Sequence, residues 1–292
     1  MRSVLITGTS SGFGLHTAVE VARRGWHVFA MARRGWHVFA TMRNLAKRAP
    51  LDAAVAAAGA AERLDVTQLD VTQAASVEAG VRAVLQRAGG HLDAVVHNAG
   101  VAVGGAFEDV PDAEARRVME TNFWGVLALT RALLPTFRAQ RSGRIVIVSS
   151  NSAYAGEPAN AIYVASKWAI EGWAESLAYE VTPFNIGVVL VEPGSYKTEI
   201  WGNSPRVLPE NSAYRALMQH LEKAIDEKVL ASARDPREVA QVIARALDAR
   251  KPRFRYPVGP DAWIGHLVRG KLPSRVQRFA ITRLLGLHRV RS

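Results

Sequence analysis

The sequence predicts an α/β fold, a doubly wound parallel sheet with helices on both of its faces. Short runs of Val, Ile and Leu alternate with longer helical segments, which is typical of a sheet buried on both sides. A glycine-rich turn follows the first of these runs directly. The 292 residues are 49% hydrophobic and 22% charged, a composition that excludes disordered, collagen-like and coiled-coil chains.

The elements follow one another in a regular order. The first strand is expected at residues 4–7 and the first helix at 14–24, where apolar residues recur on one helical stripe. Later strands are expected at 92–97, 144–149 and 186–192, with helices at 74–88, 112–138 and 161–182. Parallel strands place ligand sites at their carboxyl ends, so functional residues are expected directly after each strand.

Two tandem repeats interrupt this order. The letters ARRGWHVFA occupy residues 22–30 and again 32–40, and LDVTQ occupies 64–68 and again 69–73. If the first WHVFA forms the second strand, the preceding helix is about 16 Å long and matches a five-residue strand of about 17 Å. If the second does, a continuous helix would grow to about 31 Å and overshoot the sheet. The first copy is therefore favoured, although slippage between identical copies stays open.

The turn after the first strand has the form of a phosphate-binding turn. Its glycines allow a sharp bend and a close approach of the backbone, while the following helix offers N–H groups and positive potential. Two serines add hydroxyl donors, and the alternative is a tight surface turn without a ligand. The predicted dinucleotide contacts in the turn are Gly8, Ser10, Ser11, Gly12, Phe13 and Gly14.

The end of the second strand bears on the choice of cofactor. An acidic residue there binds the free ribose hydroxyl of NAD, whereas an arginine accepts the additional phosphate of NADP. Each WHVFA copy has an arginine three residues after its last alanine and no acid. NADP(H) is therefore preferred over NAD(H), with Arg33 as the first choice and Arg43 as the fallback; a solvated surface arginine is the alternative for either.

Four polar residues have the spacing of a catalytic set. Tyr163 and Lys167 are four residues apart on one helical face, where a lysine cation would lower the pKa of the phenol. Ser150 ends a predicted strand 13 residues before Tyr163 and is placed to polarise a carbonyl oxygen. Asn122 lies 41 residues before Tyr163, and its amide is expected to hold a water that links Lys167 to solvent. Taken singly, each has an ordinary structural alternative.

With these residues in order, the chain resembles the short-chain dehydrogenase/reductase family over residues 1 to about 200, and within it the hydroxysteroid and retinol dehydrogenase-like branch. The shared motifs are TGTSSGFG at 7–14, HNAG at 97–100, the asparagine of ETNFWG, SS at 149–150, YVASK at 163–167 and EPGSYKT at 192–198. The resemblance implies a Rossmann-type single domain of about seven strands. It also assigns Asn122, Ser150, Tyr163 and Lys167 as the catalytic tetrad.

The resemblance implies further cofactor contacts. They are one aspartate of the two LDV copies, Asp65 or Asp70, together with Asn98, Ala99, Gly100, Pro193, Gly194, Tyr196 and Thr198. Five residues separate the aspartates, so in one continuous strand they would face opposite sides, and either remains possible. His97 stands where the family usually has asparagine, which leaves the contact of that side chain in doubt.

The expected activity is NADP(H)-dependent interconversion of a carbonyl and an alcohol on a small lipophilic substrate, such as a steroid, retinoid or ketone. Tyr163 would act as the general acid/base. A substrate-covering segment is expected at about 199–230, with Trp201, Tyr214, Leu217, Met218 and Leu221 lining a pocket or packing between helices. The alternative is a catalytically silent dinucleotide-binding regulator or scaffold.

Charge and composition bear on the partners. The net charge is +11, of which +9 falls in residues 251–292 and only +2 in the rest, so nucleic acid is not an expected partner. Residues 1–260 are expected to form the cofactor-binding and catalytic domain, and 261–292 a basic amphipathic extension. That extension either touches a membrane surface weakly or packs on the core or on a sister subunit.

Composition also bears on location and cofactors. The chain contains no cysteine, and its eight histidines are scattered, so no metal is expected. The first strand begins so early that a signal peptide is not expected either. A homo-oligomer in the cytoplasm is the expected state.

Overall fold

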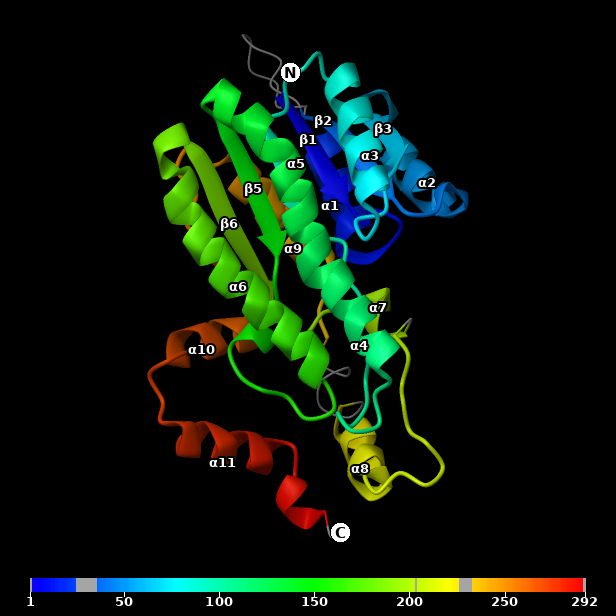
Figure 1. The fold of residues 1–292 in the computed structure, drawn as a ribbon, viewed down its shortest axis with the longest axis vertical. Helices are drawn as coiled ribbons and strands as arrows, with labels where there is room; N and C mark the ends of the chain where they lie inside the picture. Colours follow the sequence, from blue (N-terminus) through cyan, green and yellow to red (C-terminus); the bar gives the residue numbers. More distant parts are fainter. Residues whose placement is uncertain (1, 25–35, 203, 226–232, 291–292) are drawn as a thin grey trace.

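The computed structural model describes residues 2–24, 36–202, 204–225 and 233–290. In this part of the chain, seven parallel strands form one sheet in the order β3-β2-β1-β4-β5-β6-β7 (Figure 1). The strands are β1 (Arg2–Thr7), β2 (Trp36–Met42), β3 (Leu64–Gln68), β4 (Ala94–His97), β5 (Gly143–Val148), β6 (Ile186–Pro193) and β7 (Arg255–Val258). The strand order reverses direction between β1 and β4, which places a crevice at their carboxyl ends.

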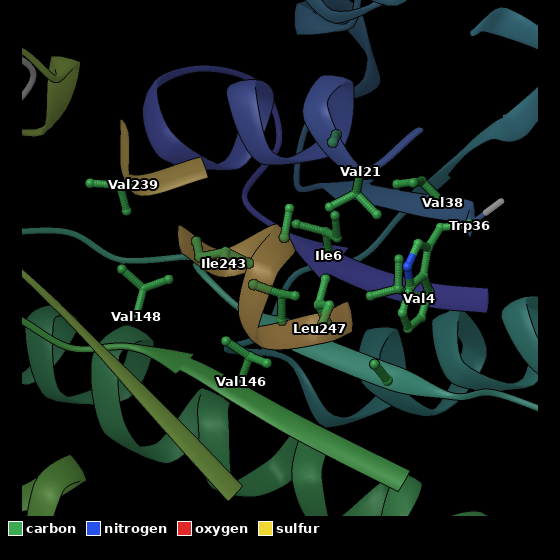
Figure 2. Close-up of a cluster of buried hydrophobic side chains, with 14 of the residues drawn as sticks. Val4, Ile6, Val21, Trp36, Val38, Val146, Val148, Val239, Ile243 and Leu247 are labelled. Carbon is green, nitrogen blue, oxygen red and sulfur yellow. The ribbon is translucent and has the colours of Figure 1, made fainter. Parts of the chain in front are cut away.

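Helices cover both faces of the sheet. One face carries α1 (Gly12–Arg23), α2 (Ala49–Ala57) and α9 (Arg237–Asp248), and the other carries α3 (Ala74–Arg87), α5 (Gly125–Gln140) and α6 (Ala161–Val181). Figure 2 shows the first face, where Val4 and Ile6 of β1 meet Val21 of α1 and Ile243 of α9. Leu5, between them in sequence, packs on the opposite face. Strands buried on both sides therefore read as continuous apolar runs.

Shorter elements connect these layers. The remaining helices are α4 (Asp112–Met119), α7 (Glu199–Gly202), α8 (Arg215–Ile225), α10 (Pro260–Val268) and α11 (Ser274–Leu284), with η1 (Leu45–Lys47), η2 (Ala61–Arg63), η3 (Glu120–Trp124), η4 (Asn151–Ala153), η5 (Thr182–Phe184) and η7 (Leu287–Arg289). The helix expected at 112–138 is divided, because η3 is a π-helical stretch between α4 and α5. Among the described helices, none combines the length and the apolar character needed to cross a membrane.

The second copy of WHVFA forms β2, so the prediction that the first copy does is wrong. Trp36 pairs with Arg2 and Thr41 with Thr7 in a parallel register with β1. The predicted overshoot does not arise, because α1 ends at Arg23.

The first copy of LDVTQ forms β3, which ends at Gln68. The second copy leaves the strand: Leu69 is buried, and its backbone N–H donates to the carbonyl of Met42 at the end of β2. Asp65 and Asp70 therefore do not share one continuous strand. Asp65 lies within β3, whereas Asp70 lies two residues beyond the carboxyl end of β3.

Candidate active site

Ser150, Tyr163 and Lys167 come together at the carboxyl end of β5. Ser150 follows β5 by two residues, and its hydroxyl makes a hydrogen bond with the hydroxyl of Tyr163 on the first turn of α6. Lys167 lies one helical turn further on, with Nζ 5.5 Å from the centroid of the Tyr163 ring. Its ammonium donates to the carbonyl oxygen of Val148 at 2.9 Å, which ties α6 to the end of the strand. The three side chains are buried.

Burial dominates the electrostatics of this group. It raises the pKa of Tyr163 well above the ordinary value; the hydrogen bond from Ser150 opposes this rise, and the negative charge of Glu157 adds to it. The expectation that Lys167 makes this phenol acidic is therefore wrong for the structure described. Burial also lowers the pKa of Lys167 to about 8, against an opposing effect of the Glu171 carboxylate. Tyr163 is thus a protonated hydrogen-bond donor at neutral pH.

Asn122 lies in η3, and its amide joins two parts of the site. Its Oδ1 accepts from the backbone N–H of Val101 at 2.9 Å, and its Nδ2 donates to the carbonyl of Val101 at 2.9 Å and to Oγ of Ser166 at 3.0 Å. Both amide hydrogens are thus used within the protein. Asn122 holds the segment after β4 against α6, and a relay water would meet only its Oδ1.

The glycine turn is fixed by the segment that follows β4. Asn98 Nδ2 donates to the carbonyls of Thr7 and Gly8 at 2.9 and 3.0 Å, and the backbone N–H groups of Asn98 and Ala99 both donate to Oγ1 of Thr7 at 3.0 Å. A Cβ at Gly14 would lie 2.2 Å from the carbonyl oxygen of Gly8. Only glycine fits at position 14, because the turn and the helix are packed directly against each other.

The start of α1 suits the phosphates of a dinucleotide. Ser11 is the N-cap residue in an extended conformation, and its side chain makes no capping hydrogen bond. Gly12 has φ +52°, and a Cβ there would meet the side chain of Thr198 at 3.8 Å. The segment after β6 thus lies opposite the turn, and the helix N-terminus supplies donors between them. These features fit the cofactor that the sequence implies.

The structure also describes the other residues of this region that were predicted to contact the cofactor. Phe13 packs edge-on against Tyr196 at 5.8 Å between ring centroids, and the Tyr196 hydroxyl donates to Glu238 at 3.1 Å. Gly194, after Pro193 ends β6, lies so close to Asp261 that a Cβ would come within 1.9 Å of its Oδ1. Ser10 and Ser11 are partly exposed, and Gly100 lies beside Asn122.

Three of the four paired candidates for the ribose and adenine contacts lie in the described part of the structure. Arg43 directly follows β2 and is exposed, whereas Arg33 follows the copy that does not form the strand and lies outside the described residues. Asp65 lies near the start of β3, with Oδ2 2.7 Å from His37 Nε2. Asp70 lies at the carboxyl edge, where its Oδ1 accepts from the N–H and hydroxyl of Thr72 at 3.0 and 2.7 Å.

A cavity of about 540 Å³ opens beside the start of α6. Its lining is mostly apolar but includes two carboxylates: Ala106, Phe107, Glu108, Glu157, Pro158, Ala159, Ala161, Tyr214 and Leu217. Tyr214 and Leu217 therefore line a pocket, which was one of the two roles expected for them; the other was packing between helices. Leu221 is buried at 1% exposure, and the side chain of Trp201 lies outside the described part of the structure.

Sequence reasoning missed two acidic residues near the catalytic group. Glu157 accepts a hydrogen bond from Asn160 Nδ2 at 3.0 Å, and burial raises the pKa of its carboxyl. Glu171 is 1% exposed, one turn of α6 beyond Lys167, and pairs with Arg255 and Arg269. An acid four residues after the lysine, and an acid between the serine and tyrosine motifs, are the signals that point to them.

His97 has a structural role of its own. It is 2% exposed, and its Nε2 lies 2.9 Å from Oγ1 of Thr130 on α5. Burial lowers the pKa of His97 to about 3, so the imidazole is neutral. Its hydrogen bond to Thr130 joins the end of β4 to α5. This is the contact made by the histidine at a position where the family usually has asparagine.

Comparisons with known proteins agree with this geometry. The family model described as short chain dehydrogenase matches residues 2–207. The chain is 37% identical to the uncharacterized oxidoreductase YusZ of Bacillus subtilis, over 93% of this chain and 94% of that protein. It is 36% identical to retinol dehydrogenase 8 of Bos taurus, over 87% of this chain and 80% of that protein.

A solved structure supports the same conclusion. The short-chain dehydrogenase of Streptomyces avermitilis superposes with a TM-score of 0.76 at 31% identity, over 99% of this chain and 97% of that one. The chain belongs to the short-chain dehydrogenase/reductase family. It is an oxidoreductase that acts on alcohol or carbonyl groups with a nicotinamide dinucleotide, which confirms the predicted fold and the predicted class of enzyme.

Proposed function

We propose that this enzyme interconverts a carbonyl and an alcohol on a small lipophilic substrate, with NADP(H) as its preferred cofactor. The observation that carries the proposal is the hydrogen-bonded Ser150–Tyr163 pair, placed with Lys167 at the carboxyl end of β5. A largely apolar cavity has Ala161, two residues before Tyr163 on α6, in its lining. The bound cofactor supplies the hydride in reduction and accepts it in oxidation.

The residues of the chain supply the proton chemistry. Because burial keeps Tyr163 protonated, its hydroxyl is ready to donate a proton to the oxygen of a carbonyl that is being reduced. Ser150 holds that oxygen with a second hydrogen bond and orients the phenol. The ammonium of Lys167 is fixed on the carbonyl of Val148, which ties α6 to the end of β5 and so holds Tyr163 in place.

The lining of the cavity supports a lipophilic substrate. Phe107, Pro158 and Leu217 offer apolar surface beside the first turn of α6, which carries Tyr163. The chain also resembles a protein named for retinol, which is consistent with this class of substrate. Steroid, retinoid and ketone substrates therefore form the first set to test.

The substrate is tested with a panel of carbonyl compounds and NADPH, with oxidation followed at the nicotinamide absorbance. Steroid ketones, retinal and long-chain ketones are expected to be reduced faster than short polar aldehydes. Ser150→Ala is expected to lower turnover by about 10²–10³-fold with the same compound, as loss of an oxyanion donor does. Binding of NADPH without turnover of any compound would instead support a catalytically silent regulator.

The cofactor preference is tested at Arg43, which is exposed directly after β2. Arg43→Ala is expected to raise KM for NADPH about tenfold or more and to leave KM for NADH unchanged, because only NADP carries the additional phosphate. Arg48→Ala is the matched control, since that guanidinium is paired with Asp52 at 2.7 Å. Equal effects on both cofactors would contradict the assignment.

Other sequence predictions remain predictions. Asp70, at the carboxyl edge of β3, is the aspartate that we propose for the adenine contact. A homo-oligomer and a cytoplasmic location remain predictions from the sequence. The division into a catalytic domain at 1–260 and a basic extension at 261–292 also remains a prediction from the sequence.

A further inference from the structure

The C-terminal helices expose apolar side chains to an unusual extent. No residue of α11 is buried, and its apolar side chains Val276 and Phe279 are 47% and 62% exposed. On α10, Trp263, Ile264 and Leu267 are 46%, 64% and 55% exposed. Figure 1 shows α11 set apart from the sheet and its two helical layers. Packing on the core, one of the expectations for this extension, therefore does not account for these residues.

The same segment carries a one-sided charge. Between residues 262 and 290 the chain has six Lys or Arg residues and no Asp or Glu. In the described part of the structure, Lys271, Arg275, Arg278 and Arg289 are exposed and no carboxylate lies within ion-pair distance of them. We define the C-terminal basic surface as these four residues together with Trp263, Ile264, Leu267, Val276 and Phe279.

We propose that the C-terminal basic surface docks on an anionic phospholipid surface. Exposed apolar side chains with interspersed cations are what an interfacial helix needs, because the first enter the acyl boundary and the second meet the lipid phosphates. A second copy of the chain fits less well. An isologous contact would bring two sets of unpaired cations together, with no acid in either segment to compensate them.

The C-terminal segment also adjoins the wall of the cavity. Nε2 of His220 on α8 donates to the carbonyl of Leu285, just after α11, at 2.8 Å. Leu217, on the same helix, lines the cavity together with Tyr214. Docking would thus place α8, which forms part of the wall of the proposed substrate cavity, close to the lipid. That consequence rests on the proposed function, whereas the docking itself does not.

The test is co-sedimentation of the full chain with vesicles. One set holds equal parts of phosphatidylglycerol and phosphatidylcholine, and the other holds phosphatidylcholine alone. The chain is expected to sediment with the first set and not with the second, and to be released as salt rises toward 0.5 M, because salt screens exposed charges. Equal binding to both sets, or no binding to either, would overturn the proposal.

Variants locate the contact. Arg275→Glu combined with Arg278→Glu, and separately Phe279→Ser, are each expected to weaken vesicle binding at least about tenfold, the effect of about 1.4 kcal/mol. The matched controls are Arg82→Glu on α3 and Tyr179→Ser on α6, where the tyrosine is 74% exposed; neither is expected to change binding. Controls that weaken binding as much as the test variants would contradict the assignment.

Two further readouts separate lipid docking from other outcomes. Turnover of a water-soluble carbonyl without vesicles is expected to be unchanged in every variant, which shows that the variants fold. The molar mass in solution, from light scattering, is expected to be the same for wild type and Phe279→Ser. A lower mass for Phe279→Ser would show that a second copy covers this surface and would overturn the proposal.

Discussion

Phe39 tests which copy of the repeated nonapeptide forms β2. It is 1% exposed, and its register partner in β1 is Leu5, which pairs in turn with Val95 of β4. These side chains belong to the core on the side of α3, α5 and α6. Replacing a buried phenylalanine by alanine removes its apolar contacts and leaves a cavity, which together destabilise a protein by about 3–5 kcal/mol. Phe29 has the same place in the first copy.

The equivalent substitutions are expected to differ. Phe29→Ala leaves β2 intact and is therefore not expected to show the cavity cost of about 3–5 kcal/mol at that strand. Phe39→Ala permits an escape, because the chain can slip by ten residues and place the intact first copy in β2. The loss in the free energy of unfolding is therefore set by the less costly of two outcomes, a cavity at position 39 or a slipped register. The double variant has no escape and is expected to show the full loss of about 3–5 kcal/mol.

Urea unfolding followed by circular dichroism measures all three variants, with the midpoint and slope fitted for each. The difference between the double variant and Phe39→Ala then reports the free energy of slippage directly when slippage is the smaller cost. A slipped chain would also carry Arg33 rather than Arg43 after β2, so its KM for NADPH would depend on position 33. A larger loss in Phe29→Ala than in Phe39→Ala would refute the assignment of β2.

Three further predictions follow from the site. Gly14→Ala is expected to weaken NADPH binding at least about tenfold in a calorimetric titration, because its Cβ would lie 2.2 Å from a backbone oxygen, while Gly172→Ala, with open space around it, is not. Glu157→Gln removes a charge that raises the pKa of Tyr163, so the pH at which alcohol oxidation reaches half its maximum should fall; an unchanged pH profile would contradict this. Burial lowers the pKa of Lys167 to about 8 in the folded protein. Between pH 8 and 10.5 this lysine is therefore protonated in the unfolded chain and largely neutral in the folded one. The free energy of unfolding should then rise with pH over this range, by up to about 3 kcal/mol. Lys167→Met should remove that rise when urea midpoints at pH 7.5 and pH 10 are compared with wild type; an identical dependence would show that another group causes it.

The sheet could be predicted from the sequence because its strands are short, apolar and separated by helices of regular length. Val4 to Thr7 and Ile186 to Glu192 lie in strands as expected. The choice between the repeated copies could not be predicted, because their nine letters are identical and neither copy has a local signal that the other lacks. The length of the first helix favoured the first copy, but this criterion was misleading. The helix α1 ends at Arg23 although the second copy forms β2.

The site shows the same division between local pattern and tertiary environment. Spacing was sufficient to bring Ser150, Tyr163 and Lys167 together, because a strand end and a helical turn fix their positions. The direction of the pKa shift of Tyr163 could not be predicted, since it depends on burial by residues distant in sequence. Glu157 was missed for the same reason: an acid does stand between the serine and tyrosine motifs, but its proximity to Tyr163 follows from the path of a loop and not from its spacing in the sequence.

Turnover and cofactor affinity of Tyr163→Phe test the role of Tyr163 as proton donor most directly. This change removes the hydroxyl that bonds to Ser150 and keeps the buried ring. We expect kcat for carbonyl reduction to fall by at least about 10²-fold, the contribution of a general acid, while the Kd for NADPH stays within about twofold of wild type. A variant that keeps wild-type kcat on a substrate reduced by the wild-type enzyme would contradict the assignment of Tyr163 as the proton donor.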